Sequence, residues 1–509
     1  MELSFNLIEQ PWIPCIKLDG SRVRLGIGQT LKEAHTLREV HAQSPLVTVA
    51  ILRLLLAILH RVYGPPSTDE WCNLSRDSQW DPKKLDDYFS EFDDRFDLFH
   101  DKYPFYQVTS MPKDARRRSI VCLVPERASG SNDTLFEHST DDDEPAFAPS
   151  QAACYLLAEH CLGLQNNAQS ASCAQRLGYL VDGVQVLIRG DSLRNTCWLN
   201  MVVYDGKLQP FPTNGADLPA WERNAQAFQF LKNPPEGDPA GYLDYLTFNH
   251  RYIKLHPELL DGELCVRIVQ IAQGPKISAG WHCDQFKVYG ESQDKKTPIR
   301  PMKLRRDRAL WRDSDAFIGL RGSGHQSENV RRLASEEAFQ VISKGTRLNL
   351  DIFGVANFQS AIYLWRHERL PLPLPLLRDD ECRTLLGVAL RHSENTGFAL
   401  KQTVNRLNRH LLLRQGAAGK VNPPIDPNRA VGAFWSELDV PFYGFLSTIV
   451  GNPTASLETW AVTTRNAAFD AFSGAVAKLR FTANALQAIA VCEQQLRSQL
   501  YESQKEISA

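Results

Sequence analysis

Residues 276–347 of this 509-residue chain are rich in basic side chains, with fifteen Lys and Arg against nine Asp and Glu. The densest run comprises Lys295, Lys296, Arg300, Lys303, Arg305, Arg306 and Arg308. Because Lys and Arg neutralise phosphates, this basic stretch predicts contacts with the backbone of DNA or RNA. A solvated surface and a patch for a partner protein explain the same composition, and both alternatives stay open.

Two segments after the basic stretch predict paired strands with a polar tip. Residues 348–352 and 362–366 alternate apolar with other side chains, which is the period of a strand. The loop between them contains Asn357, Phe358, Gln359 and Ser360. Small polar groups address base edges, and inserted or stacked side chains disturb base steps. The tip therefore suits nucleic acid, with an ordinary hairpin turn as the alternative.

Residues 125–150 predict a long irregular loop. Turn-forming Gly, Ser, Asn and Asp residues are followed by an acidic run at 141–144 and by Pro145. A loop of this length within a compact domain is usually functional or disordered.

Patterns typical of enzymes and metal sites are missing from the sequence. It has no Gly-x-Ser-x-Gly elbow and no His-Glu-x-x-His helix, and its eleven cysteines include no Cys-x-x-Cys pair. Gly26-Ile-Gly28 and Gly322-Ser-Gly324 lack the rest of a phosphate-binding loop. We therefore expect a non-enzyme without cofactor or metal. A metal-dependent nuclease is the rival from another class, since acidic pairs are frequent.

The composition indicates a globular protein, and its nearly balanced charges produce no strong overall electrostatic field. The formal charge is 57 − 59 = −2, so any attraction for a polyanion must be local. The apolar run at 46–59 contains Arg53 and is too short to cross a bilayer. Scattered cysteines fit a reducing compartment. We expect a cytoplasmic protein that does not bind membranes.

The first part of the chain predicts mixed helices and strands. Asp19-Gly20 predicts the turn of an N-terminal hairpin, and Ser44-Pro45 the start of a helix that ends at Gly64. Ser150 is expected to cap a helix that reaches Leu164. Residues 184–188 and 197–203 are expected to be strands.

The last part of the chain predicts helices only. Pro371, Pro373 and Pro375 indicate a semi-rigid linker. Helices are expected at about 379–393, 395–415, 430–450 and 456–504. The predicted fold class is α+β: a large mixed α/β domain at 1–370, followed by a four-helix bundle at 376–509.

Seven segments, in order, resemble the CasA family, the large subunits of the type I-E CRISPR surveillance complex Cascade. They are Phe5-Asn-Leu-Ile-Glu-Gln-Pro-Trp-Ile-Pro, Ser44-Pro-Leu-Val-Thr-Val, Thr134-Leu-Phe-Glu-His, Leu187-Ile-Arg-Gly, Tyr242-Leu-Asp-Tyr-Leu, Leu310-Trp-Arg-Asp and Trp365-Arg-His-Glu. The resemblance runs nearly end to end and implies the same two-domain arrangement.

The resemblance also implies a role without catalysis. CasA-like subunits join other Cascade subunits and the CRISPR RNA (crRNA), recognise the protospacer-adjacent motif (PAM) in double-stranded target DNA, and help to open that duplex. They also support recruitment of a separate helicase–nuclease for antiviral defence. Base pairing with the guide then reads the long sequence, while the protein reads only the short motif. A pure assembly scaffold is the further alternative.

Residues at two places carry over from the family by resemblance. Gln359 matches the glutamine wedge that unstacks the base pair beside the PAM, and Asn357, Phe358 and Ser360 would meet the minor groove. The loop at 128–144 matches the one that contacts the 5′ handle of the crRNA and neighbouring subunits, through Asn132, Leu135 and Phe136. Phe136 in the protein core is the alternative.

Two further elements carry over by resemblance, and the first of them departs from the family's pattern here. The glycine-rich loop that approaches the groove corresponds to residues 168–174, which hold Ser170, Ala171 and Ser172 and no glycine. The lysine finger is assigned to Lys287, with Lys295 and Lys296 as competitors. Phosphate contacts are expected from Lys295, Lys296, Arg305 and Arg306.

Overall fold

The computed structural model divides the chain into two compact units. It describes residues 3–124, 145–164, 177–181, 183–281, 283–291, 299–305, 307–319, 327–342, 346–358, 361–414, 423–480 and 482–508. The first unit contains the described residues up to Arg308 and those from 327 to Arg369. The second contains residues 309–319 and the described residues from Leu370 onward.

The N-terminal hairpin of the first unit is confirmed. Strands β1 (Ile13–Lys17) and β2 (Arg22–Leu25) pair antiparallel, and β3 (Leu37–Val40) pairs with the other edge of β1. Gly20 has φ = 89°, a left-handed conformation that glycine adopts without steric cost. Its amide donates to the carbonyl of Lys17 and closes the turn.

Helix α2 (Pro45–Tyr63) forms the central helix of the first unit. The hydroxyl of Ser44 accepts a hydrogen bond from the Leu46 amide and caps the helix as expected. The helix has 19 residues and is long and apolar enough to cross a membrane, so the expectation that this run is too short was wrong. However, 78% of its most apolar window is buried inside the protein.

The remaining helices of the first unit are shorter than α2. They are α1 (Ile27–Lys32), α3 (Thr68–Leu74), α4 (Pro82–Glu91), α5 (Pro149–Leu162), α6 (Leu193–Asn200), α7 (Tyr242–Leu246), α9 (Glu328–Leu333) and α10 (Glu336–Val341). Single 3-10 turns are η1 (Asp93–Arg95), η2 (Ile120–Leu123), η3 (Ala220–Glu222) and η4 (Ala225–Phe228).

Two sequence predictions failed in this region. Residues 197–203 were expected to be a strand, but residues 197–200 belong to α6 because the Ser192 hydroxyl caps a helix by accepting from the Asn195 amide. Ser150 lies within α5 instead of capping it. Ala148 is the N-cap residue, and its amide donates to the side chain of Gln151.

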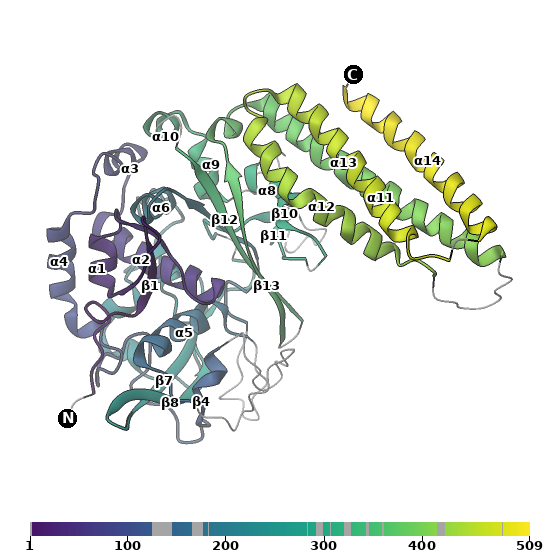
Figure 1. The fold of residues 1–509 in the computed structure, drawn as a ribbon. Coiled ribbons are helices and arrows are strands. Elements are labelled where there is room, and N and C mark those ends of the chain that lie inside the picture. Colours follow the sequence, from purple (N-terminus) through teal and green to yellow (C-terminus); the bar gives the residue numbers. More distant parts are fainter. Residues whose placement is uncertain are drawn as a thin grey trace. The chain divides into compact units, whose positions relative to one another are not determined.

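Two three-stranded sheets complete the first unit (Figure 1). One consists of β4 (Arg118–Ser119), β8 (Glu263–Gln273) and β7 (Arg251–Leu260), in that order. The other has the order β13 (Ala361–Leu372), β12 (Leu348–Phe358) and β5 (Gln185–Arg189). Short pairs join β10 (Tyr289–Glu291) with β11 (Ile299–Pro301), and β6 (Glu236–Gly237) with β9 (Lys276–Ile277).

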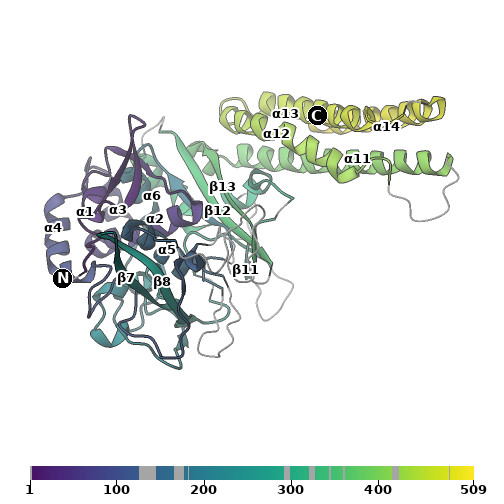
Figure 2. The ribbon, with the colours of Figure 1, turned by 60° about the horizontal axis from the view of Figure 1, so that its bottom comes forward.

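The second unit is built on four long helices, whose packing Figure 2 shows along their length. They are α11 (Asp380–Arg414), α12 (Pro427–Thr448), α13 (Pro453–Val476) and α14 (Ala483–Ser508). Helix α11 packs on the other three, and α13 also packs on α12 and α14. A mixed α+β fold with C-terminal helices is thus confirmed.

The helix boundaries differ from those expected. The two segments predicted at 379–393 and 395–415 are one helix, because Gly397 does not break α11. A Cβ built on Gly397 would lie 3.1 Å from both Phe434 and Trp435, so this glycine permits close packing of α12. The segment predicted as one helix at 456–504 is two, because Thr482 starts α14 by accepting from the Ala485 amide.

The predicted linker is not a free spacer. Residues 371–372 end β13, and residues 374–377 form η6 (Leu374–Leu377), in which Leu374, Leu376 and Leu377 are buried.

Residues 309–319 belong to the second unit, although the sequence places them in the first domain. They form η5 (Leu310–Asp313) and α8 (Ser314–Ile318). The Trp311 ring stacks on Phe442 with 4.4 Å between centroids, and its indole N–H donates to Asp439 at 2.6 Å. Side-chain packing over more than a hundred residues of sequence decides this membership.

Candidate nucleic-acid interface

The predicted tip lies between two long antiparallel strands. Asn357 and Phe358 are the last residues of β12, and β13 begins at Ala361. Gln359 and Ser360 lie outside the described residues, as do the side chains of Asn357 and Phe358. Their proposed contacts with DNA therefore stay predictions, although the paired strands around them are confirmed.

The β12–β13 hairpin is joined to the rest of the first unit through β5. Five consecutive pairs fix the register, from Asn349 opposite Arg189 to Phe353 opposite Gln185. All five β5 residues are buried. Both faces of β5 are thus packed, and a one-residue slip would exchange the side chains of the two faces, so packing specifies this register strongly.

Four charged side chains close an alternating ring at the base of this hairpin. The ion-pair ring consists of Glu39 on β3, Arg189 on β5, Asp351 on β12 and Arg369 on β13. The two Asp351 contacts measure 3.4 Å to Arg189 and 2.7 Å to Arg369. Glu39 pairs with Arg369 at 2.9 Å and also with Arg189.

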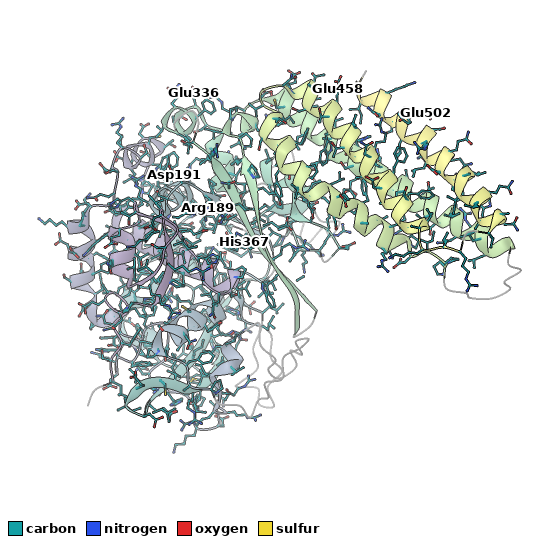
Figure 3. The ribbon with its side chains drawn as sticks, viewed as in Figure 1. Arg189, Asp191, Glu336, His367, Glu458 and Glu502 are labelled. Carbon is teal, nitrogen blue, oxygen red and sulfur yellow. The ribbon has the colours of Figure 1, made fainter. Side chains whose placement is uncertain are left out.

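His367 extends the ion-pair ring along β13. Its Nε2 lies 3.3 Å from Asp351, and its ring stacks on Phe353 with 4.4 Å between centroids and 5° between planes. Figure 3 labels Arg189 and His367, which reach Asp351 from different strands.

Both acids of the ring are held in the ionised form. Burial raises the pKa of Asp351, but hydrogen bonds from His367 and Arg369 and the charge of Arg369 outweigh burial, lowering that pKa from 3.8 to about 2. Burial likewise opposes ionisation of Glu39, and the charges of Arg189 and Arg369 lower its pKa below the ordinary value.

Residues 301–305 of the basic stretch lie beside the hairpin. The Val184 amide donates to the Met302 carbonyl at 2.9 Å, which places residues 301–305 next to the start of β5. Leu304 packs over Gly354 of β12, where an added Cβ would lie 3.4 Å from Leu304 Cβ. Tertiary structure thus brings residues 301–305, from the densest part of the basic stretch, against the strand that leads to the predicted tip.

Arg305 is accessible in this arrangement. Its side chain is 63% exposed, and its pair with the still more exposed Asp307 spans 3.7 Å. An exposed pair at this distance contributes little, so Arg305 is available to a phosphate at small cost. Lys295, Lys296 and Arg306 lie outside the described residues, and their phosphate contacts stay predictions.

Lys287, the predicted finger, occupies an inward position in this structure. The residue is only 8% exposed, and its Nζ donates to the Tyr179 carbonyl at 2.7 Å. Gly183, at φ = 127°, lies beside the aliphatic stem of Lys287. A Cβ there would approach that stem at 3.3 Å, so glycine makes room for it.

A buried ion pair holds the segment that leads to Lys287. Arg53 of α2 lies 3.6 Å from Asp284, and the Tyr245 hydroxyl also donates to Asp284. The Arg53 guanidinium lies 5.0 Å from the Tyr245 ring centroid, in the geometry of a cation–π contact. With this packing, Lys287 connects its own segment to Tyr179. Its assignment as a DNA-contacting finger stays a prediction.

The other predicted contacts fall outside the described residues. These are Asn132, Leu135 and Phe136 of the long loop, and Ser170, Ala171 and Ser172 of the segment matched to the glycine loop.

Sequence reasoning missed the ion-pair ring. A signal was present, because Asp351 interrupts an apolar, alternating segment, and His367 and Arg369 lie in the charged run at 366–369. Their partner Glu39 is 330 residues from Arg369 in sequence, so no local pattern links them.

Metal-binding chemistry has no support among the described residues. They contain no group of three or more His, Cys, Asp or Glu side chains that could hold a metal ion. All ten cysteines in the described segments are free thiols.

Comparisons with known proteins agree on one family. The profile described as CRISPR-associated protein Cse1 matches residues 6–471. CRISPR-associated protein CasA/Cse1 of Thermus thermophilus is 28% identical, covering 99% of this chain and 98% of the relative.

Solved structures share the fold over the whole chain. CasA (Cse1) of Thermus thermophilus has a TM-score of 0.79 at 26% identity, covering 99% of this chain and 100% of that chain. Cse1 of Acidimicrobium ferrooxidans has a TM-score of 0.83 at 22% identity, with 100% of both chains covered. A chain of a structure described as a CRISPR RNA-guided surveillance complex has a TM-score of 0.77 at 19% identity, covering 98% and 99%.

Proposed function

The chain belongs to the CRISPR-associated Cse1 family, and from this premise we propose that it is the PAM-recognising subunit of a type I-E Cascade complex. The observation that carries the proposal is the packing of the basic stretch against β12, through Leu304 and Gly354. It brings groups suited to phosphates beside the hairpin whose connecting residues are suited to base steps.

The hairpin supplies the wedge. Gln359, with Asn357, Phe358 and Ser360 around it, enters the minor groove beside the PAM and unstacks the adjacent base pair. Unstacking costs a few kcal/mol per step, so the strands that carry the wedge must resist being pushed back. Leu350 and Ile352 are fully buried in β12 and provide that anchorage.

The basic stretch supplies affinity without sequence preference. Lys295, Lys296, Arg305 and Arg306 track the phosphates of the target duplex. Each neutralised phosphate should contribute about −0.9 to the slope of log affinity against log salt concentration. Replacing Lys295 and Lys296 by Ala should flatten that slope and weaken right and wrong PAMs almost equally.

The remaining assignments concern partners. Asn132, Leu135 and Phe136 contact the 5′ handle of the crRNA and neighbouring Cascade subunits, while Ser170, Ala171 and Ser172 approach the PAM groove. The subunit acts in the cytoplasm without catalysis and supports recruitment of the helicase–nuclease. Phe136→Ala should weaken assembly of this subunit onto the complex, and unchanged assembly would return Phe136 to the protein core.

The decisive experiment compares closed and pre-opened DNA. Assembled complexes with wild-type chain or Gln359→Ala are titrated with intact PAM duplex, and with the same duplex mismatched open next to the PAM. We expect Gln359→Ala to bind closed duplex poorly and the opened duplex nearly as well as wild type. The rescue should be about tenfold or more, which corresponds to about 1.4 kcal/mol per decade.

Controls separate this function from its rivals. Gln29→Ala removes an exposed glutamine of α1 and should change neither affinity. Equal binding of PAM and scrambled-PAM duplexes by wild-type complex would favour a pure scaffold. Cleavage of labelled duplex by the purified chain with Mg²⁺ or Mn²⁺ would favour the nuclease.

A further inference from the structure

We infer that the ion-pair ring of Glu39, Arg189, Asp351 and Arg369 is a positioning device that holds the base of the β12–β13 hairpin during duplex opening. This inference rests on the proposed function, because it assigns the ring to the wedge that Gln359 supplies. Glu39 is the residue through which the ring connects two sheets, since it belongs to a different sheet from the other three.

The strand that most needs support is β13. It is the edge strand of the β13–β12–β5 sheet, with β12 as its neighbour. Force on the residues that follow β12 would therefore bend β13 away from β12 or move both strands together. Backbone hydrogen bonds to β5 restrain only the inner strand β12.

The ring restrains β13 directly. Arg369 reaches Asp351 within the hairpin and Glu39 on β3, outside it. The neighbouring Arg366 secures β13 by donating to the carbonyl of Arg308 at 2.6 Å. The base of β13 is thus attached to two segments other than its partner strand.

Side chains leave an open space beside the ring. A cavity of about 120 Å³ lies there, lined by residues that include Val40 of β3, Arg189, Asp351 and His367. Helices α2 and α6 pack on β3 and on the β13–β12–β5 sheet, and the ion pairs add a direct link between the two sheets where side chains do not fill the space. Asp351 and Arg189 are buried, so solvent screens their interaction little.

The charge pattern suits positioning more than ligand binding. Two guanidinium groups alternate with two carboxylates, each of which has lowered pKa, so the four formal charges cancel. A planar guanidinium holds its carboxylates in a fixed geometry, which a point charge does not.

The test uses Glu39→Gln, which keeps the size of the side chain but removes the charge shared by Arg189 and Arg369. In the assembled complex this variant should bind closed PAM duplex about tenfold more weakly, within the range of coupling that residues away from a ligand exert. Affinity for the pre-opened duplex should stay near wild type. Combined with Gln359→Ala, it should cause no further loss on closed duplex.

Glu328→Gln is the matched control. It removes an exposed ion pair with Arg331 on α9, at 2.6 Å, that does not involve β12 or β13. Affinity for both duplexes should be unchanged. Should Glu39→Gln fail to fold, Arg369→Lys keeps the charge, loses the fork, and should give a smaller defect of the same kind.

Two outcomes would overturn the inference. Equal loss on closed and opened duplexes, additive with Gln359→Ala, would make the ring a general support of the fold. Wild-type affinity for both duplexes would remove its role in opening.

A second measurement separates failure of this inference from failure of the proposed function. If Gln359→Ala itself has no defect, the wedge assignment is wrong, but the ring can still be tested in the free chain. Amide hydrogen exchange of Glu39→Gln should then show protection lost in β12 and β13 and retained in β7 and β8. Unchanged protection in β12 and β13 would overturn the positioning role irrespective of DNA.

Discussion

The two units of this protein differ in how many charged side chains they bury. Among the described residues, nine Arg, Lys, Asp and Glu are buried in the first unit and none in the second. Those of the first unit include Arg53 with Asp284, Glu159 with Arg251, and Arg189 with Asp351.

The second unit buries rings and hydroxyls instead. Trp311, Phe442 and Trp460 pack together, with centroids of Phe442 and Trp460 5.6 Å apart. Its buried hydroxyls donate to carbonyls one helical turn back, as Ser393 does to Ala389 at 3.0 Å and Thr464 to Trp460 at 2.8 Å.

The difference reflects what each kind of structure must satisfy. Helices satisfy their own backbone groups, so packing of apolar faces suffices to hold them. The first unit fixes short strands and irregular segments in one arrangement. Buried ion pairs are demanding in geometry and add little net stability, so we interpret them here as a source of specificity.

The largest effect should come from breaking a buried pair in the first unit. Arg251 contacts Glu159 at 2.8 Å and donates to the Leu164 carbonyl at 2.8 Å. Arg251→Met leaves Glu159 buried without its cation and should lower the free energy of unfolding by about 3–5 kcal/mol. Urea denaturation measures this loss. Glu159→Gln added to Arg251→Met should recover part of it, and additive losses would contradict the pairing.

The second-largest effect should come from acid, which should destabilise the first unit. Burial lowers the pKa of His60 from 6.5 to about 3, and the charge of Arg332 lowers it further. Burial also lowers the pKa of His160 from 6.5 to about 4; the charge of Arg251 acts in the same direction, and the hydrogen bond to Tyr106 opposes it. Both stay neutral when folded and protonate when unfolded, so their stabilisation is complete above pH 6.5 and lost as pH falls toward 4 and 3. At pH 5 each should cost about 2 kcal/mol.

Urea denaturation between pH 7 and pH 5 measures this acid effect. His160→Gln can still donate to the Tyr106 carbonyl but does not titrate, so it should remove about half of the pH dependence that His60 and His160 together contribute. A profile as steep as wild type would show that His160 is not the source.

A hydroxyl of the second unit should matter less. The Trp460 indole N–H donates to Ser393 at 3.0 Å and also lies 3.3 Å from the Ala389 carbonyl. Ser393→Ala removes one acceptor and leaves the other, so the cost should be about 1 kcal/mol. Thermal unfolding measures it. A loss as large as that of Arg251→Met would remove the contrast between the units.

The smallest effect should come from an exposed pair of the second unit. Glu493 and Arg497 on α14 lie 2.8 Å apart, one helical turn from each other. Glu493→Gln should cost about 0.3–0.5 kcal/mol at low salt and nothing measurable at high salt. A cost that persists at high salt would indicate packing instead of charge.

Local sequence determined those elements whose signals lie within a few residues. Asp19-Gly20 predicted the first hairpin, Ser44-Pro45 the start of α2, and the apolar alternation around 348–366 the two strands of the candidate site. Each depends on a turn conformation, a cap or a period, which neighbouring residues specify. Ordered motifs also sufficed to indicate the family.

Tertiary structure decided the features that depend on distant partners. Gly397 continues a helix because Phe434 and Trp435 pack against it, and residues 309–319 join the second unit because Trp311 packs on Phe442. Lys287 turns inward to the Tyr179 carbonyl, and Glu39 meets Arg369 across 330 residues. A single sequence specifies such contacts only through the folded chain, since burial and charge pairing depend on which segments meet and not on the order of residues within either.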